Sequence, residues 1–165
     1  MKIELKRFTT NARLSQETTA FAADVWIDGK KAGTAENDGH GGATMVHLHL
    51  LDRAVRDQVD AHGKTLVPAE YKSFMSYDGA GTEWLVDQLV EAELQKKADK
   101  SFAKKIANAD TKQKAACAKQ GLSAARMRNG DTWTWFAFKP GSDPKAVADA
   151  IAAKHKALVD ELVLL

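Results

Sequence analysis

Two dipeptides, Asp28-Gly29 and Asn129-Gly130, each separate a pair of strand-like runs, and they constrain the fold of this chain more than any other feature. Glycine tolerates the positive φ angle of a tight turn, so each dipeptide predicts a β-hairpin. The flanking runs cover residues 21–27, 31–36, 123–128 and 132–139. A further alternating run covers residues 1–6. Because hairpin strands are antiparallel, the chain is expected to build antiparallel sheet near both ends.

Helical periodicity occurs in several segments outside the two hairpins. Apolar residues at steps of three and four predict a long helix over 82–108, with Thr82 as its N-cap. A helix from about residue 50 is expected to end at Gly63 as a left-handed C-cap, and residues 64–81 are expected to be irregular. A polar break at 108–110 precedes a short helix over 112–120, and Pro144 opens a helix through about 156. Residues 158–165 fit either a helix or a strand.

These patterns predict a single α+β domain over residues 1–165. Its antiparallel sheet should have about five strands, with three to four helices packed mainly on one face. A length of 165 residues with 44% apolar and 28% charged residues suits one folded domain. Cys117 is the only cysteine, so no intrachain disulfide can form, and we expect a buried thiol. No run of 18 apolar residues occurs, which favours a cytoplasmic protein without a membrane segment.

The charge is unevenly distributed along the chain. Residues 96–128 hold ten Lys and Arg side chains against two Asp, whereas residues 1–95 hold ten against fifteen Asp and Glu. Helical spacing brings Lys97, Lys100 and Lys104 to one side, where they would attract a polyanion or an acidic partner. The alternative is a solvated, lysine-rich helix face.

The segment Asn37-Asp38-Gly39-His40-Gly41-Gly42, called the Gly–His loop below, is the most specific candidate binding site. Three glycines bare consecutive backbone N–H groups that could cradle an anion beside one imidazole, which suits a phosphate. The predicted ligand-binding residues are Asn37, Gly39, His40, Gly41 and Gly42, with counter-charge from Lys30, Lys31 or Arg53. The alternative is a bend in which glycine avoids steric strain.

Three histidines, His40, His47 and His49, lie within ten residues and could bind a metal ion together with Asp52. His-x-His is a weak pattern, and no Glu follows at a metalloprotease spacing. We therefore expect no metal and no cofactor. Trp133 and Trp135 alternate with threonines on their predicted strand and are expected to pack in the core.

The N-terminal third resembles small uncharacterised proteins encoded by bacteriophages and prophages. The resemblance covers residues 1–50 and lies in Leu14-Ser15-Gln16-Glu17-Thr18, Ala20-Phe21, the hairpin Asp28-Gly29-Lys30-Lys31-Ala32-Gly33, and the Gly–His loop. It implies a phage accessory protein of the host cytoplasm, of the kind that counters host defence by binding a protein or a nucleotide messenger.

The first functional hypothesis is a binding protein, rather than an enzyme, that captures a phosphorylated small molecule or nucleotide at the Gly–His loop. The second is a protein- or nucleic-acid-binding inhibitor that uses the basic 96–128 surface. The third is a metal-dependent hydrolase. The expected partner is a small phosphorylated ligand or a host protein. Binding to nucleic acid and self-association are further options. Binding to a membrane is not expected.

Overall fold

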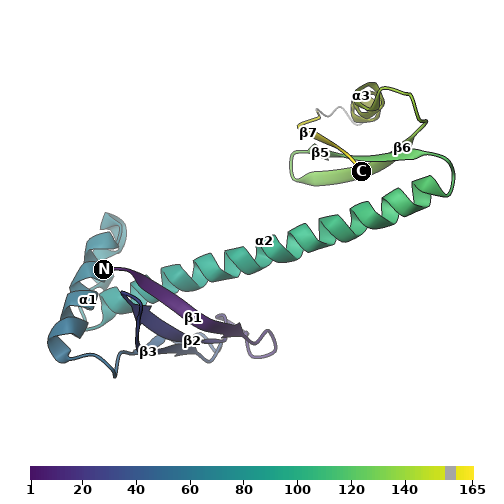
Figure 1. The fold of residues 1–165 in the computed structure, drawn as a ribbon. Coiled ribbons are helices and arrows are strands. Elements are labelled where there is room, and N and C mark those ends of the chain that lie inside the picture. The colour runs from purple at the N-terminus through teal and green to yellow at the C-terminus, as the bar shows by residue number, and fades with distance from the viewer. Residues whose placement is uncertain (155–158) are drawn as a thin grey trace. The chain divides into compact units, whose positions relative to one another are not determined.

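The computed structural model describes residues 1–154 and 159–165 and shows an α+β fold, which confirms the predicted class (Figure 1). The helices described are α1 (Arg53–Leu66), the 3-10 helix η1 (Ala69–Phe74), α2 (Ala80–Ala118) and α3 (Pro144–Lys154). The strands described are β1 (Ile3–Thr10), β2 (Phe21–Ile27), β3 (Lys30–Asn37), β4 (Met45–His47), β5 (Ser123–Asn129), β6 (Thr132–Phe138) and β7 (Glu161–Leu164). They form two antiparallel sheets, ordered β1-β2-β3-β4 and β6-β5-β7, instead of one sheet of about five strands.

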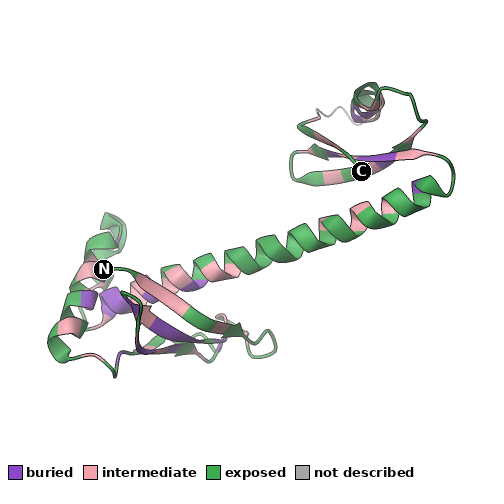
Figure 2. Ribbon diagram, viewed as in Figure 1, coloured by how far each residue is buried: buried purple, intermediate pink, exposed green. Residues whose placement is uncertain are grey.

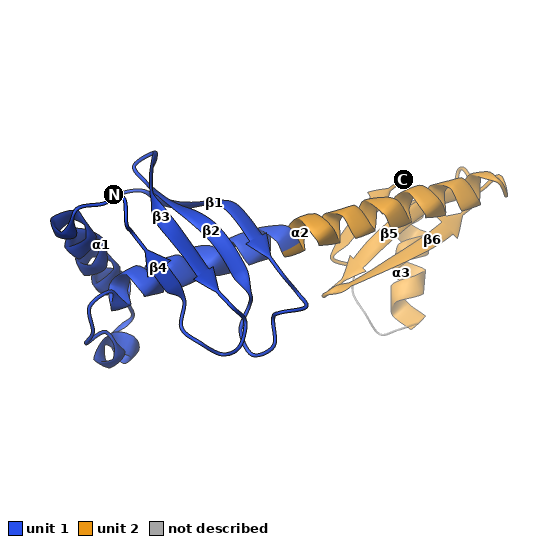
Figure 3. Cartoon of the chain, turned by 90° about the horizontal axis from the view of Figure 1, so that it is seen from below, with its two compact units in different colours: residues 1–97 blue, residues 98–165 orange. Residues whose placement is uncertain are grey.

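The chain divides into two compact units, residues 1–97 (unit 1) and residues 98–165 (unit 2), and the boundary falls inside α2 (Figure 3). Unit 1 carries 12 Lys and Arg against 15 Asp and Glu, a net charge of −3, while unit 2 carries 12 against 7, a net charge of +5. The single domain expected over 1–165 stays a prediction, because two compact units can still fold cooperatively.

The core of unit 1 lies against one face of its sheet. Alternate residues of β2, including Val25 and Ile27, point into this core and meet Val59 of α1 with Val86 and Val90 of α2. Both helices therefore contribute to the same face, as expected for the first hairpin sheet. The intervening β2 residues, including Trp26, point to the opposite face.

A close approach between α1 and the start of α2 explains why the predicted end of α1 is wrong. Gly63 is buried within α1, which continues to Leu66, instead of ending the helix as a left-handed cap. A Cβ atom on Gly63 would lie 2.0 Å from the carbonyl oxygen of Gly81. Only glycine fits between two backbones at this distance, so Gly63 is needed for close packing and not for a turn.

The predicted boundaries of α2 also need correction. The helix begins at Ala80 instead of after Thr82, and it runs through residues 108–110 without a break. At that point Thr111 donates its hydroxyl hydrogen bond to the carbonyl of Ala107, so a polar side chain is accommodated inside the helix. The middle turns of α2 are exposed (Figure 2). The segment 64–81, expected to be irregular, contains η1.

Unit 2 pairs its hairpin, β5 and β6, with the C-terminal tail. The tail forms β7 and lies beside β5, which resolves the ambiguity of residues 158–165 for residues 161–164. Ala125, Met127 and Phe136 pack with Ala148 of α3 in its core. The predicted end of α3 near 156 falls on residues 155–158, outside the described residues.

The other face of this sheet packs against unit 2's part of α2. Trp135 donates its indole hydrogen bond to Asp110 at 2.6 Å, and Arg126 pairs with the same carboxylate at 3.3 Å. Trp133 and Trp135 are partly exposed, and Cys117 is buried as predicted. No described helix is both long enough and apolar enough to cross a bilayer.

Candidate functional site

The backbone N–H groups of the Gly–His loop are already used by side chains of the chain itself. Gly39 donates to the Asn37 side chain at 2.8 Å, and His40 donates to the Asp38 side chain at 3.1 Å. Gly41 donates to the hydroxyl oxygen of Thr18 at 3.3 Å. An anion bound here would have to replace these hydrogen bonds, so the loop does not present a free nest of donors.

The loop packs against the segment 14–18. The carbonyl of Gly39 accepts hydrogen bonds from the backbone N–H groups of residues 16, 17 and 18, and its φ of 89° is in the left-handed region. The Glu17 carboxylate lies against Gly41, where an added Cβ would meet it at 2.3 Å, and it would repel a phosphate. These contacts favour the bend that the sequence left as an alternative. Phosphate binding at the loop stays a prediction.

The predicted counter-charges do not gather around this loop. Lys30 begins β3 and Asn37 ends it, so about 23 Å of strand separates them. Lys31 pairs with Asp24 at 2.9 Å, and Arg53 at the start of α1 is 3.9 Å from Asp57. Gly42, the last loop residue, accepts a hydrogen bond from the Asn37 amide.

The histidines are likewise placed separately. His40 is exposed in the Gly–His loop, His47 ends β4, and His49 lies in the following turn, with its Nδ1 3.2 Å from the carbonyl oxygen of His47. Asp52 precedes α1 as its N-cap residue. Across residues 1–154 and 159–165, no three His, Cys, Asp or Glu side chains are grouped to hold a metal ion. The hydrolase hypothesis therefore gains no support.

The three lysines of the predicted polyanion site differ in their surroundings. Lys97 donates to the carbonyl of Phe8 at 3.3 Å and lies 4.3 Å from the centre of its ring, so it contributes to the packing of unit 1. Lys100 and Lys104 belong to unit 2 and are exposed.

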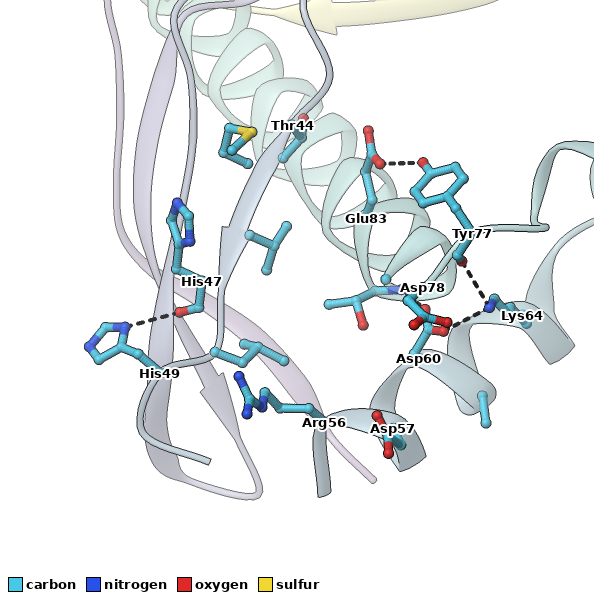
Figure 4. A pocket seen from close by; sticks show the side chains of 16 residues that line it. Thr44, His47, His49, Arg56, Asp57, Asp60, Lys64, Tyr77, Asp78 and Glu83 are labelled. Carbon is cyan, nitrogen blue, oxygen red and sulfur yellow. Dashed lines mark hydrogen bonds and ion pairs between the residues drawn. The ribbon is translucent and has the colours of Figure 1, made fainter. Parts of the chain in front are cut away.

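A pocket of about 570 Å³ in unit 1 is the candidate functional site (Figure 4). One wall follows β4 and its flanking residues from Thr44 to His49, and the other comes from α1, the turn at Tyr77-Asp78-Gly79 and the start of α2. Ligand pockets of small molecules have volumes of this order. The sequence analysis passed over this site because its walls come from segments that are far apart along the chain.

Asp60 of α1 forms the fixed part of the acidic wall. Its Oδ1 accepts hydrogen bonds from the backbone N–H groups of Gly81 at 2.7 Å and Thr82 at 3.1 Å, so it caps α2 from another helix. Lys64 pairs with its second oxygen at 2.8 Å. Burial opposes ionisation, but the Lys64 and backbone hydrogen bonds prevail and lower the pKa of Asp60, which stays charged.

Tyr77 and Glu83 form a second polar pair in the pocket. The Tyr77 hydroxyl donates to the Glu83 carboxylate at 2.5 Å, and this hydrogen bond, followed by burial and nearby carboxylates, raises the pKa of Tyr77 to about 12. The phenol therefore stays protonated at neutral pH. Lys64 ties the same turn to α1 by donating to the carbonyl of Tyr77 at 3.1 Å.

The pocket lining carries more negative than positive charge. Four carboxylates, those of Asp57, Asp60, Asp78 and Glu83, face two cations, Arg56 and Lys64. Because Lys64 is already paired with Asp60, the remaining acidic groups favour a ligand that brings positive charge or hydrogen-bond donors. The spacing of Asp57, Asp60 and Lys64 on one helical face is the signal in the sequence that could have indicated this wall.

No family model, curated protein or solved structure matches this chain.

Asp87, which follows Glu83 by one helical turn, has a raised pKa. Burial is the main cause, the negative charges of Glu83 and Glu91 add to it, and the hydroxyl of Thr44, which donates at 2.6 Å, opposes it. Because the folded pKa lies above the unfolded one, folding weakens ionisation. Asp87 therefore costs stability as the pH rises through these two pKa values, and this cost persists at neutral pH.

We expect Asp87→Asn to raise the melting temperature at pH 7, because asparagine keeps the acceptor for Thr44 and removes the charge. The gain should disappear at roughly pH 3, where the aspartate is itself largely protonated. Thermal unfolding by circular dichroism at both pH values measures the difference. A variant that is less stable at pH 7 would contradict the assignment.

Proposed function

We propose that this chain is a binding protein, without catalytic activity, that takes up a small cationic ligand in the pocket of unit 1. The observation that carries the proposal is the convergence of carboxylates from α1, the 77–79 turn and α2 on one cavity of about 570 Å³. Ammonium and guanidinium groups are the chemical classes that such a lining recognises, through charge-assisted hydrogen bonds.

Side chains of the pocket are held in place before such a ligand binds. Glu83 is held by Tyr77, so this carboxylate does not have to be ordered when a ligand binds, and Asp60, through its bonds to the start of α2, fixes the wall beside it. Asp78 is exposed and available at the same wall. Preorganised polar groups bind more tightly because less conformational entropy is lost on binding.

Calorimetric titration with agmatine, L-arginine and spermidine tests the proposal. We expect saturable binding of at least one of these cations, weakened roughly tenfold in the double variant Asp78→Asn/Glu83→Gln, because each charge-assisted hydrogen bond is worth more than about 1 kcal/mol. Asp60 is left unchanged in this test because it also caps α2.

Glu36→Gln is the matched control, since Glu36 is an exposed carboxylate of unit 1 that does not line the pocket. It should bind the cations as the unchanged protein does. The proposal fails if no cation binds, and equally if the control loses binding as the double variant does. Binding of AMP that is lost in His40→Ala would instead support the phosphorylated ligand expected at the Gly–His loop.

A second candidate function, recognition of a polyanion or acidic partner by the basic 96–128 surface, is favoured by one feature of α2. The lysines of α2 that belong to unit 2 are all exposed. Asp110 faces the sheet of unit 2, and Asp99, three helical turns earlier, lies on the same side of the helix as Asp110. These lysines are Lys100, Lys104, Lys105, Lys112 and Lys114. Such a surface suits a protein- or nucleic-acid-binding inhibitor.

Either binding role is compatible with the phage accessory protein that the N-terminal resemblance implies. We extend the proposal to that setting: a protein of the host cytoplasm that sequesters a ligand or partner, as a counter-defence factor does.

A further inference from the structure

Trp26 lies on the face of the unit 1 sheet that is opposite the core. It alternates with the core residues Val25 and Ile27 of β2, and α2 lies behind the sheet in the view of Figure 3. Trp26 is partly exposed, and the ammonium group of Lys6 lies 3.7 Å from the centre of its ring. The Trp26 Nε1 atom is buried and has no hydrogen-bond partner within the described part of the chain. A buried donor without an acceptor is costly, so Trp26 is not explained by the stability of the sheet alone.

Cations gather around this tryptophan. Lys31 is the cross-strand neighbour of Trp26 in β3, and Lys6 is opposite Asp24 in β1. Arg7, at the bulge of β1 with a φ of 51°, pairs with Asp24, and Lys31 pairs with the same carboxylate. Hydrogen bonds from Lys31 and then Arg7 lower the pKa of Asp24. Two cations therefore share one carboxylate. Glu4, opposite Trp26 in β1, pairs with Lys2 at 2.9 Å, so Lys6 leaves this face locally positive although unit 1 as a whole is negative.

We propose that this face, defined by Lys6, Arg7, Trp26 and Lys31, binds single-stranded nucleic acid. One unpaired base stacks on Trp26, and the neighbouring phosphates pair with the three cations. Duplex bases are already stacked on each other, so the unpaired strand is the form that an exposed ring selects.

Lys6 does not block this site. An exposed cation–π contact is weaker than the stacking of a nucleobase on tryptophan, so a base can displace the ammonium from the ring. The released ammonium remains on the same face and is free to pair with a phosphate. The same side chain thus protects the ring in the free protein and neutralises charge in the complex.

Fluorescence anisotropy with a labelled 15-nucleotide oligo(dT) and the whole 165-residue chain tests the proposal. Trp26→Ala should weaken binding about tenfold or more, and Trp26→Phe should restore most of the affinity, because phenylalanine keeps a stacking face. Lys6→Ala should weaken binding and reduce the slope of log affinity against log salt by about 0.7, the value for one phosphate contact to a single strand. Lys6 is exposed, so this variant tests the site even if Trp26→Ala fails to fold.

Two matched controls separate this face from the rest of the molecule. Trp84→Phe changes a tryptophan of unit 1 whose ring contacts Tyr71, and it should leave the affinity within twofold. Lys100→Glu/Lys104→Glu changes the basic surface of α2 and should do the same. The proposal is overturned if Trp26→Ala and Lys6→Ala both bind as the unchanged protein does, if the α2 variant alone abolishes binding, or if AMP competes as well as unlabelled oligo(dT).

Discussion

Replacing Gly63 with alanine should destabilise unit 1 by roughly 3 kcal/mol, a large fraction of the stability of an ordinary domain. In an exposed helix the same change would stabilise the protein by about 1 kcal/mol, because alanine is the better helix former. Here the added Cβ would lie 2.0 Å from the carbonyl oxygen of Gly81 and 2.3 Å from its carbonyl carbon. Both are backbone atoms, so α1 and α2 must move apart, and steric overlap outweighs helix propensity.

Gly42→Ala is the matched control for this prediction. Gly42 has no atom within 4 Å of an added Cβ, and its φ lies outside the left-handed region, so the substitution should change stability by less than about 0.5 kcal/mol. Urea unfolding followed by circular dichroism compares the two variants. If Gly63→Ala is as stable as Gly42→Ala, the close approach of the two helices is wrong.

Asp60→Ala should lower the stability of the protein by about 2–3 kcal/mol. The change removes the cap of α2, leaves the N–H groups of Gly81 and Thr82 without their acceptor, and frees Lys64 from its ion pair. Asp60→Asn should cost less, because its amide oxygen can still accept the two backbone hydrogen bonds.

The effect of Asp60 depends on pH in a defined direction. Its folded pKa is lowered, so its ionised form stabilises the fold above the unfolded pKa, and this stabilisation is lost as the pH falls through the folded value. The difference between the unchanged protein and Asp60→Ala should therefore narrow in acid. Chemical unfolding at pH 7 and at roughly pH 3 measures it, and a difference that grows in acid would refute the capping role.

The parts of the fold that sequence reasoning predicted are those specified by neighbouring residues. Both hairpins follow from their turn glycines, since Gly29 and Gly130 adopt positive φ angles between antiparallel paired strands. The tail stayed ambiguous because β7 is defined by pairing with β5, about 36 residues earlier in the chain. Gly63 was misread for the same reason, because the residue that makes it necessary, Gly81, lies on another helix.

The candidate site shows more clearly that contacts between distant segments cannot be predicted from local sequence patterns. The Gly–His loop was conspicuous in the sequence, but Asn37, Asp38 and Thr18 occupy its donors, which no local pattern reveals. The pocket depends instead on Asp60 and Glu83, which are ordinary helical carboxylates until α1 and α2 meet. Trp26 gave no signal in the sequence either, because its alternation with Val25 does not tell which face of a strand stays open.

Because α2 is continuous across the unit boundary, its central turns determine where the helix unfolds locally. Each unit keeps its own apolar cluster, but residues 95–105 of α2 are exposed, so those turns gain little from burial and are maintained mainly by backbone hydrogen bonds and helix propensity. Such turns open locally at a lower free-energy cost than packed ones, and their amides exchange with solvent hydrogen sooner. Within α2, the centre of the helix, and not its ends, is then the place where the backbone first becomes accessible to a protease.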